Sequence, residues 1–220
     1  MDANFLEAIK ILNKSNLHYW ICHGTLLGFV RNRSLIKWDN DIDIGLWESK
    51  SNRIKISEIF KQSGFNKKKK FFDKDNILTF TKGKNREIDI NFYELTKNKK
   101  YCYQKHYVLK NLAARIIYVL SVSDTYTGKY KILINKLYFL KKFFIFFKKK
   151  LIKYNSFYTP AGFITPSIFF KRIKIMNINA INIKIPFYYK EYLKAIYGKD
   201  WRHPIKKYDW EKNPNSTKLF

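Results

Sequence analysis

The sequence predicts an α+β (α/β) protein in which helices flank a mixed β-sheet and the C-terminal part is mostly helical. Two kinds of periodicity carry this prediction. Apolar and polar residues alternate over 41–46 and 87–95, as they do in half-buried strands. Apolar residues recur every three or four positions in 3–12 and 51–63, as they do in amphipathic helices. Because these segments follow one another closely, we expect a single sheet with helices on its faces.

The first hundred residues supply the elements of this sheet in order. Asp2 is suited to cap the first helix, which we expect to end near residues 13–16. The expected elements after it are the strand 18–22, a short helix after Gly24-Thr25, the loop 34–38, the strand 41–46, the helix 51–63 ended by Gly64, and strands at 65–72, 76–82 and 87–95.

Residues 101–220 follow a less regular pattern. We expect helices over 105–122 and 129–152, and a third from Pro186 to Tyr197 that ends at Gly198. Strands with a turn are expected within 173–185. No internal repeat and no linker is visible in the sequence. The predicted division is therefore a core over 1–100 and a helical, basic and aromatic portion over 101–220 that packs on this core, so that the chain forms one compact unit.

Composition narrows the class of protein. The chain has 220 residues, of which 46% are hydrophobic, so a sizeable core can form. No apolar run approaches the ~20 residues that span a bilayer. Residues 1–4 lack the features of a signal peptide, so we expect a cytoplasmic protein. Cys22 and Cys102 form no CxxC pair and indicate neither a disulfide framework nor a zinc site.

The net charge of +27 is unevenly distributed. Residues 1–60 hold 8 Lys and Arg against 7 Asp and Glu, residues 61–153 hold 24 against 6, and residues 154–220 hold 12 against 4. Such charge favours an anionic partner. Abundant Lys, Asn, Ile, Phe and Tyr are also what AT-rich coding produces, so charge alone does not identify the partner.

The stretches His23–Arg31 and Trp38–Ile44 are the most informative. Gly24-Thr25 is a small-residue turn that leads into a helix. Asp41 and Asp43 stand two positions apart on an expected strand, so their side chains share one face. Two carboxylates this close repel each other, and a cation offsets the repulsion. Mg²⁺ is a natural candidate because it prefers oxygen ligands and is often held by one or two carboxylates plus substrate phosphates.

Asp89 is the third candidate acid. It lies on the polar face of the strand 87–95, which we expect to neighbour the strand of Asp41 and Asp43. Asp pairs at strand edges are often simply solvated. The glycine turn in front of these acids favours a catalytic role instead.

This arrangement resembles the active site of the nucleotidyltransferase superfamily, and more closely the LicD family, which includes the fukutin-related proteins. The family pattern is matched by Gly24, Thr25, Leu26, Leu27, Gly28, Arg31, Trp38, Asp39, Asp41, Ile42 and Asp43. Tyr197-Gly198-x-x-Trp201 also resembles the C-terminal signature of that family. Asn40 stands where the family usually has an aspartate. Position 40 alternates away from Asp41 on a strand, so we expect metal binding to survive.

The resemblance implies a transferase with a nucleotidyltransferase-like core. It would move a phospho-alcohol, such as phosphocholine or ribitol phosphate, from a CDP-linked donor to a cell-surface glycan or glycolipid, including lipopolysaccharide or capsule. Mg²⁺, or Mn²⁺, would be the cofactor. Asp41, Asp43 and Asp89 would be the catalytic and metal-binding acids, with one or two metals, and Asp89 is alternatively the proton acceptor.

The remaining candidates would contact the substrate. Backbone N–H groups at Gly24-Thr25 would hold phosphate oxygens, and Arg31 and Lys37 would add charge-assisted contacts. Asp39 would be a further ligand, and His23 would contact phosphate. Three of these residues have a structural alternative: Arg31 can pin the neighbouring loop, Asp39 can cap that loop or pair with Arg31, and His23 can be a hydrogen-bonded structural histidine.

Two rival functions remain as alternatives to this transferase. The first is transfer of a nucleoside monophosphate from an NTP to a small molecule, an RNA end or a protein. The second is a basic, surface-binding module without catalysis. The intact set Asp41, Asp43 and Asp89 argues against this second alternative.

Residues 137–152 combine bulky aromatic side chains with lysines. Such a helix suits an anionic membrane surface, and the alternative is a buried helix whose lysines extend to solvent. We therefore expect a protein that can associate peripherally with the inner face of the membrane. Nucleic acid is the less favoured partner.

Overall fold

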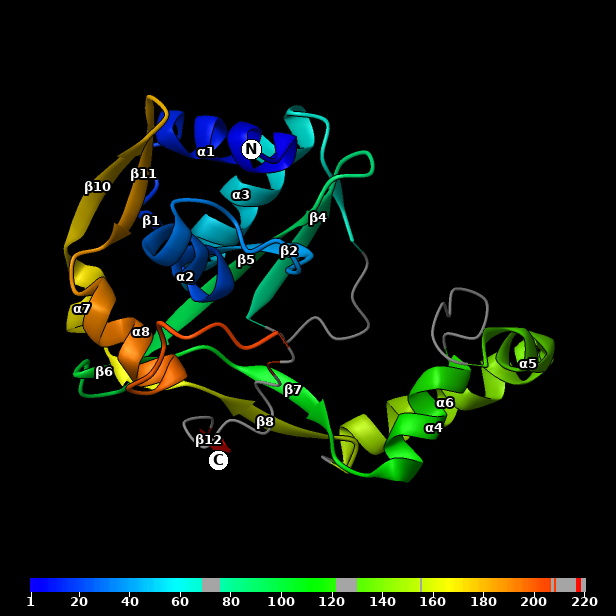
Figure 1. Cartoon of the computed structure of the whole chain (residues 1–220). Helices are drawn as coiled ribbons and strands as arrows, with labels where there is room; N and C mark the ends of the chain where they lie inside the picture. The colour runs from blue at the N-terminus through cyan, green and yellow to red at the C-terminus, as the bar shows by residue number, and fades with distance from the viewer. Residues whose placement is uncertain (69–75, 122–129, 155, 207, 209–216, 219–220) are drawn as a thin grey trace. The chain divides into compact units, whose positions relative to one another are not determined.

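The computed structural model describes residues 1–68, 76–121, 130–154, 156–206, 208 and 217–218. The chain forms two compact units, and each is described here by itself (Figure 1). The first comprises Met1–His106 and Gly162–Thr217, and the second comprises Tyr107–Ala161 and Lys218–Phe220. Residues 101–220 therefore contribute to both units.

A mixed sheet is the centre of the first unit. Its main path runs β1 (Tyr19–Ile21), β2 (Asp41–Trp47), β5 (Glu87–Leu95), β4 (Ile77–Thr81) and β3 (Asn66–Lys67). β2 and β5 are parallel, whereas β1–β2, β4–β5 and β3–β4 are antiparallel. β6 (Tyr101–Tyr103) pairs with the end of β5 and with β9 (Ile164–Pro166). The predicted mixed sheet is thus confirmed.

Helices flank this sheet, as the sequence predicts. They are α1 (Ala3–Lys14), α2 (His23–Asn32), α3 (Lys50–Gln62), α7 (Ile168–Lys171) and α8 (Tyr189–Tyr197). The Asp2 carboxylate caps α1 by accepting hydrogen bonds from the backbone N–H groups of Asn4 and Phe5 at 2.9 and 3.2 Å. The apolar face of α1 is fully buried at Phe5, Ile9 and Leu12. Helical periodicity therefore located the core-facing side correctly.

The hairpin of β10 (Ile173–Ile178) and β11 (Ile181–Pro186) completes the first unit. Its turn contains Asn179 and Ala180, both with positive φ. The prediction that Pro186 opens the last helix was wrong. Pro186 ends β11, and the helix begins at Tyr189.

The second unit contains α4 (Leu112–Ser121), α5 (Lys131–Lys136), the 3₁₀-helix η1 (Leu137–Leu140) and α6 (Lys141–Lys153), together with all but the first residue of β7 (His106–Leu109) and all but the last residue of β8 (Tyr158–Gly162). The two strands pair, and β12 (Thr217–Lys218) pairs with β8. α4 packs against α6. None of the described helices combines the length and the apolar character needed to cross a bilayer.

Two predicted helices are shorter than the sequence indicated. The helix expected over 105–122 begins only after the strand β7, because Asn111 caps it by accepting a hydrogen bond from the Ala114 N–H at 2.9 Å. The helix expected over 129–152 is divided by η1 into three helical segments. The strand expected over 65–72 is described only as β3, and residues 69–72 lie outside the described residues.

Gly28 lets α2 approach the loop that leads to the acidic strand. A Cβ atom at this position would lie 2.6 Å from the Ser34 carbonyl oxygen and 3.0 Å from the Ile36 nitrogen. Both neighbours are backbone atoms, so they cannot rotate away as a side chain would. The loop after α2 is therefore positioned by the absence of a side chain at residue 28.

We predict that Gly28→Ala lowers the free energy of unfolding by about 1–3 kcal/mol, although alanine normally stabilises a helix interior relative to glycine. Chemical denaturation measures this change. Ser51→Ala, at an exposed position of α3, is the control and should stay within about 0.5 kcal/mol of wild type. An unchanged or higher stability for Gly28→Ala would contradict the close approach.

Candidate active site

The parallel pairing of β2 with β5 brings the predicted acids together. In the register of the two strands, Asp43 lies opposite Asp89 and Asp41 lies opposite Glu87. The alternate residues Ile42, Ile44, Ile88 and Ile90 are fully buried in the core on the other face. The strand register expected for Asp89 is therefore the one observed.

The three acids share a cleft with a volume of about 430 Å³. Its lining also includes His23, Gly24, Asp39, Asn91 and Tyr197. α2 begins at His23, immediately beside Asp43, whose backbone carbonyl accepts a hydrogen bond from the Cys22 N–H at 3.1 Å. Acidic side chains and a helix N-terminus thus border the same space.

Two carboxyl groups of this cleft, those of Asp41 and Asp43, have raised pKa values. Burial raises the pKa of Asp41 to about 7, aided by a hydrogen bond and charge repulsion from Asp39. Burial also raises the pKa of Asp43 well above its ordinary value, and the charges of Asp41, Asp89 and Asp39 add to the effect. A cation in the cleft would remove this penalty on ionisation.

Neighbouring polar groups hold Asp43 in place. Its backbone N–H donates to the Thr25 hydroxyl oxygen at 2.8 Å, and its Oδ1 accepts from Asn91 Nδ2 at 3.1 Å. The Thr25 side chain is buried. Thr25 therefore positions an acid through its hydroxyl, a contact that the sequence did not reveal.

Gly24 is required by the close approach of α2 to the acids. A Cβ atom there would lie 2.3 Å from Asp39 Oδ2 and 3.6 Å from Asp43 Oδ2. Any larger residue would displace the Asp39 carboxylate. This contact explains the glycine of the Gly-Thr turn.

His23 is held by the protein on both ring nitrogens. Nε2 lies 2.7 Å from Gln104 Oε1 and 3.2 Å from the Tyr93 hydroxyl, and Nδ1 lies 3.2 Å from the Tyr192 hydroxyl. Burial lowers the pKa of His23 to about 4, so the ring is neutral at pH 7. Of the two interpretations of this histidine, the geometry favours the structural one.

A chain of hydrogen bonds joins this histidine to the acids. Gln104 Nε2 donates to Asn91 Oδ1, and Asn91 in turn donates to Asp43. The Thr79 hydroxyl donates to Asp89 Oδ1. Sequence alternation pointed to the polar face that carries Asn91, whereas no sequence signal marked Gln104 or Thr79.

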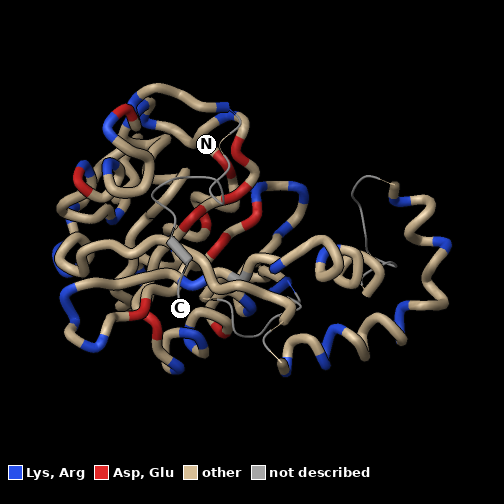
Figure 2. The backbone as a smooth tube through the Cα atoms, turned by 90° about the horizontal axis from the view of Figure 1, so that it is seen from below, with Lys and Arg blue, Asp and Glu red and all other residues tan. Residues whose placement is uncertain are grey.

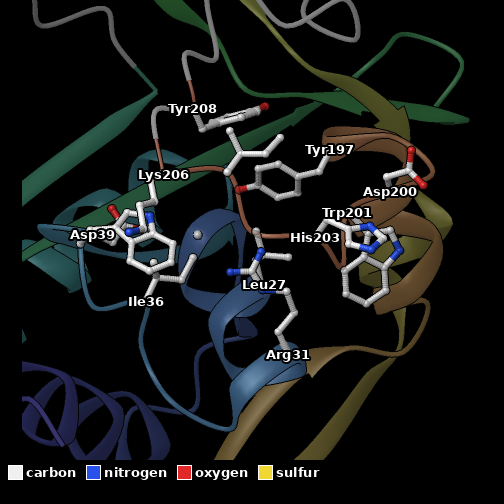
Figure 3. Close-up of a pocket in the computed structure, with 13 residues that line it drawn as sticks. Leu27, Arg31, Ile36, Asp39, Tyr197, Asp200, Trp201, His203, Lys206 and Tyr208 are labelled. Carbon is white, nitrogen blue, oxygen red and sulfur yellow. The ribbon is translucent and has the colours of Figure 1, made fainter.

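A second pocket, of about 260 Å³, adjoins the acidic cleft and shares Gly24, Asp39, Tyr197 and Tyr208 with it. Arg31, Trp201, His203 and Lys206 also line it, as Figure 3 shows. The Arg31 Nε atom is buried and has no hydrogen-bond partner among the described residues. Burial lowers the pKa of Arg31. Cationic and aromatic side chains therefore face a space next to the acids.

Lys37 and Asn40 lie at the other rim of the acidic cleft. Both are exposed and line a shallow depression with Asp39, Asp41 and Glu87. The Asn40 carbonyl accepts a hydrogen bond from the Glu87 N–H at 3.3 Å. The family's aspartate is thus replaced at an exposed position at the edge of the strand pair.

The cleft around the three acids has space for metal ligands that do not come from the protein. In the described parts of the chain, no three His, Cys, Asp or Glu side chains form a ready-made metal site. Mg²⁺ commonly takes only one or two carboxylates and completes its octahedron with water and substrate phosphates. The cleft fits that mode of binding, with Asp41 and Asp43 on one strand and Asp89 on the next.

The site combines a mixed sheet, acids on two adjacent strands, and a Gly-Thr turn that begins a helix, which is the arrangement expected from the resemblance to nucleotidyltransferases. The sequence of residues 16–120 matches the family LicD/FKTN/FKRP, nucleotidyltransferase domain. This similarity over residues 16–120 confirms the predicted resemblance to the LicD family.

Individual relatives fall into two groups. Ribitol-5-phosphate transferase FKTN of Homo sapiens is 24% identical over 211 residues, covering 94% of this chain and 34% of that protein. The same protein of Macaca fascicularis is 25% identical over 211 residues, with the same coverage. An uncharacterized protein of Rickettsia typhi is 44% identical over 57 residues, which cover 26% of this chain and 18% of that protein. The chain thus spans about a third of the FKTN proteins and about a fifth of the rickettsial protein.

The low pKa of His23 predicts how stability depends on pH. In the unfolded chain the His23 ring takes up a proton near pH 6.5, whereas in the folded protein it does so only near pH 4. The stability that His23 contributes to the fold is therefore lost as the pH falls between those two values. We predict that the difference in free energy of unfolding between wild type and His23→Gln is largest at pH 7 and shrinks toward pH 4. Urea denaturation across this range measures it. A difference that grows on acidification would contradict a buried neutral ring.

Proposed function

We propose that this protein is a Mg²⁺-dependent transferase that moves a phospho-alcohol from a CDP-linked donor to the hydroxyl of a glycan or glycolipid. The observation that carries the proposal is the alignment of Asp41 and Asp43 with Asp89 beside the N-terminus of α2. The similarity of residues 16–120 to the LicD/FKTN/FKRP family supports it. The name of the FKTN relatives favours ribitol phosphate as the transferred group, and phosphocholine belongs to the same chemical class.

Asp41 and Asp43 are the residues that would hold the cation, and Asp89 is placed to complete a site with them. Once bound, Mg²⁺, or Mn²⁺, would neutralise the negative charge of the donor's diphosphate. The raised pKa values of Asp41 and Asp43 support this assignment, because buried carboxylates need a cation in order to ionise together.

The reaction needs one proton acceptor. An acceptor hydroxyl oxygen would attack the phosphorus that carries the alcohol, the bond to CMP would break, and the hydroxyl proton would pass to a carboxylate. Asp89 is our candidate because it faces the cleft from the neighbouring strand. The Thr79 hydroxyl that donates to Asp89 Oδ1 would orient the carboxylate for this role.

The adjoining pocket is suited to the donor. Arg31, His203 and Lys206 would attract its phosphates, and the exposed Trp38 ring and the half-buried Tyr197 ring would offer faces for a base. Lys37 lies at the opposite rim, where it would meet charge at the mouth of the cleft. Backbone N–H groups at Gly24-Thr25 would contact the phosphate that lies between the pocket and the acids.

The rival reaction, transfer of a nucleoside monophosphate from an NTP, would use the same acids. The two reactions release different products: CMP from a CDP-alcohol, and pyrophosphate from an NTP. Incubation of the protein and Mg²⁺ with CDP-ribitol, CDP-choline, CDP-glycerol or each NTP, followed by mass spectrometry, distinguishes them.

We predict that the wild type releases CMP from at least one CDP-alcohol, and that Asp41→Asn and Asp43→Asn each lower this rate by at least about a hundredfold. Both variants should keep or raise the wild-type melting temperature, because an amide removes one repelling charge. Glu58→Gln, at an exposed position of α3, is the matched control and should be fully active. Near-wild-type turnover by either Asp variant would refute the assignment.

The pKa of Asp41 also predicts the pH dependence of metal binding. Its raised value of about 7 means that the metal-free fold gains stability from protonation and loses it as pH rises through 7. Mg²⁺ should therefore raise the melting temperature more at pH 8 than at pH 6. Differential scanning fluorimetry measures both shifts. The assignment would be contradicted if Mg²⁺ raised the melting temperature equally at the two pH values, or if it still raised the melting temperature of Asp43→Asn. Either result would mean that the cation binds elsewhere.

A further inference from the structure

The second unit concentrates positive charge without acids to balance it. Residues 107–161 contain eleven Lys and Arg and a single acid, Asp124, which lies outside the described residues. Figure 2 shows Lys and Arg along the helical segments of this unit, with no Asp or Glu among them. This positive charge favours binding of the second unit to a negatively charged surface.

Aromatic side chains are exposed on the same helices. In α6, Phe143 and Phe146 are 56% and 54% exposed, and Phe147 is 40% exposed. Their spacing of three and four residues places them on one side of the helix. The rings of Phe143 and Phe147 lie with their centroids 4.7 Å apart, so the exposed phenylalanines contact one another. In the preceding segments, Phe139 and Ile132 are 74% and 78% exposed.

Lysines border this aromatic stripe. Lys142, Lys149 and Lys153 recur at seven and four residues, so they form an adjacent row along α6, and all three are exposed. Lys150 Nζ lies over the Phe146 ring at 4.8 Å. Lys148 differs from these, because it is buried and lies over the Tyr118 ring of α4 at 5.6 Å. The packed side of α6 is thus distinct from its aromatic and cationic side.

We propose that this side of α6, formed by Phe143, Phe146, Phe147, Lys142, Lys149, Lys150 and Lys153, docks on the surface of an anionic lipid bilayer. The phenylalanine rings would enter the boundary between headgroups and acyl chains, and the lysines would contact the anionic headgroups. The helix would lie in the plane of the membrane, consistent with the absence of a bilayer-spanning helix among those described.

Charge and apolar exposure together select this partner. A second copy of the chain would bring two strongly cationic surfaces together, which is unfavourable. A nucleic-acid duplex would satisfy the lysines through its phosphates, but the apolar side chains of Phe139 and Ile132 would gain little from its paired and stacked bases. An anionic bilayer satisfies both kinds of side chain at once. Docking does not depend on the proposed transferase reaction, so the two can fail separately.

Vesicle co-sedimentation of the full chain tests the proposal. We expect binding to vesicles of phosphatidylcholine mixed with phosphatidylserine, and much weaker binding to phosphatidylcholine alone. The triple variants Phe143→Ser/Phe146→Ser/Phe147→Ser and Lys142→Glu/Lys149→Glu/Lys153→Glu should each lower the affinity by at least about tenfold. Because these side chains are exposed, circular dichroism should show that both variants fold.

The matched control is Lys10→Glu/Lys55→Glu/Lys61→Glu, which makes the same change in net charge at exposed positions of the first unit. Its vesicle affinity should stay near that of wild type. The proposal is overturned if wild type ignores anionic vesicles, if the control loses as much affinity as the α6 variants, or if the chain binds single-stranded RNA more tightly than vesicles and the phenylalanine variant binds vesicles normally.

Discussion

The parallel pairing of β2 with β5 is the constraint on which the candidate site depends. It sets Asp43 opposite Asp89 and buries the intervening isoleucines on the other face, so the core fixes the strand register. A shift of one residue in either strand would turn its acids toward the core and its isoleucines toward the cleft. Hydrophobic burial therefore holds mutually repelling carboxylates together, and in the proposed function a bound cation would relieve the repulsion.

Polar side chains make this arrangement precise. The hydrogen bonds from His23 through Gln104 and Asn91 reach Asp43, and Thr25 anchors the backbone of the same aspartate. These groups come from α2, β5 and the segment after β6, so three separated parts of the sequence hold the aspartate of β2 in place. The missing side chain of Gly24 gives Asp39 the space to join the cluster. The Gly-Thr turn and the acids thus form one structural unit.

The sequence predicted what local periodicity controls and missed what long-range packing controls. Alternation over 41–46 and 87–95 correctly gave the face of Asp41, Asp43 and Asp89. No sequence pattern marked Gln104, because its role depends on a hydrogen bond with His23, which lies 81 positions earlier in the sequence. Pro186 was misplaced because proline suits both the end of an edge strand and the start of a helix. The composition of 129–152 suits a helix throughout, and no sequence pattern indicated the 3₁₀ segment η1 that divides it.

The central claim is that the acids of β2 and β5 bind a divalent cation together with a nucleotide diphosphate. The most direct test is anomalous diffraction from a crystal of the protein grown with Mn²⁺ and a CDP-alcohol. We predict an anomalous peak within coordination distance of Asp41 and Asp43 and of the diphosphate. A diphosphate bound in the cleft without such a peak, or a peak away from these carboxylates, would contradict it.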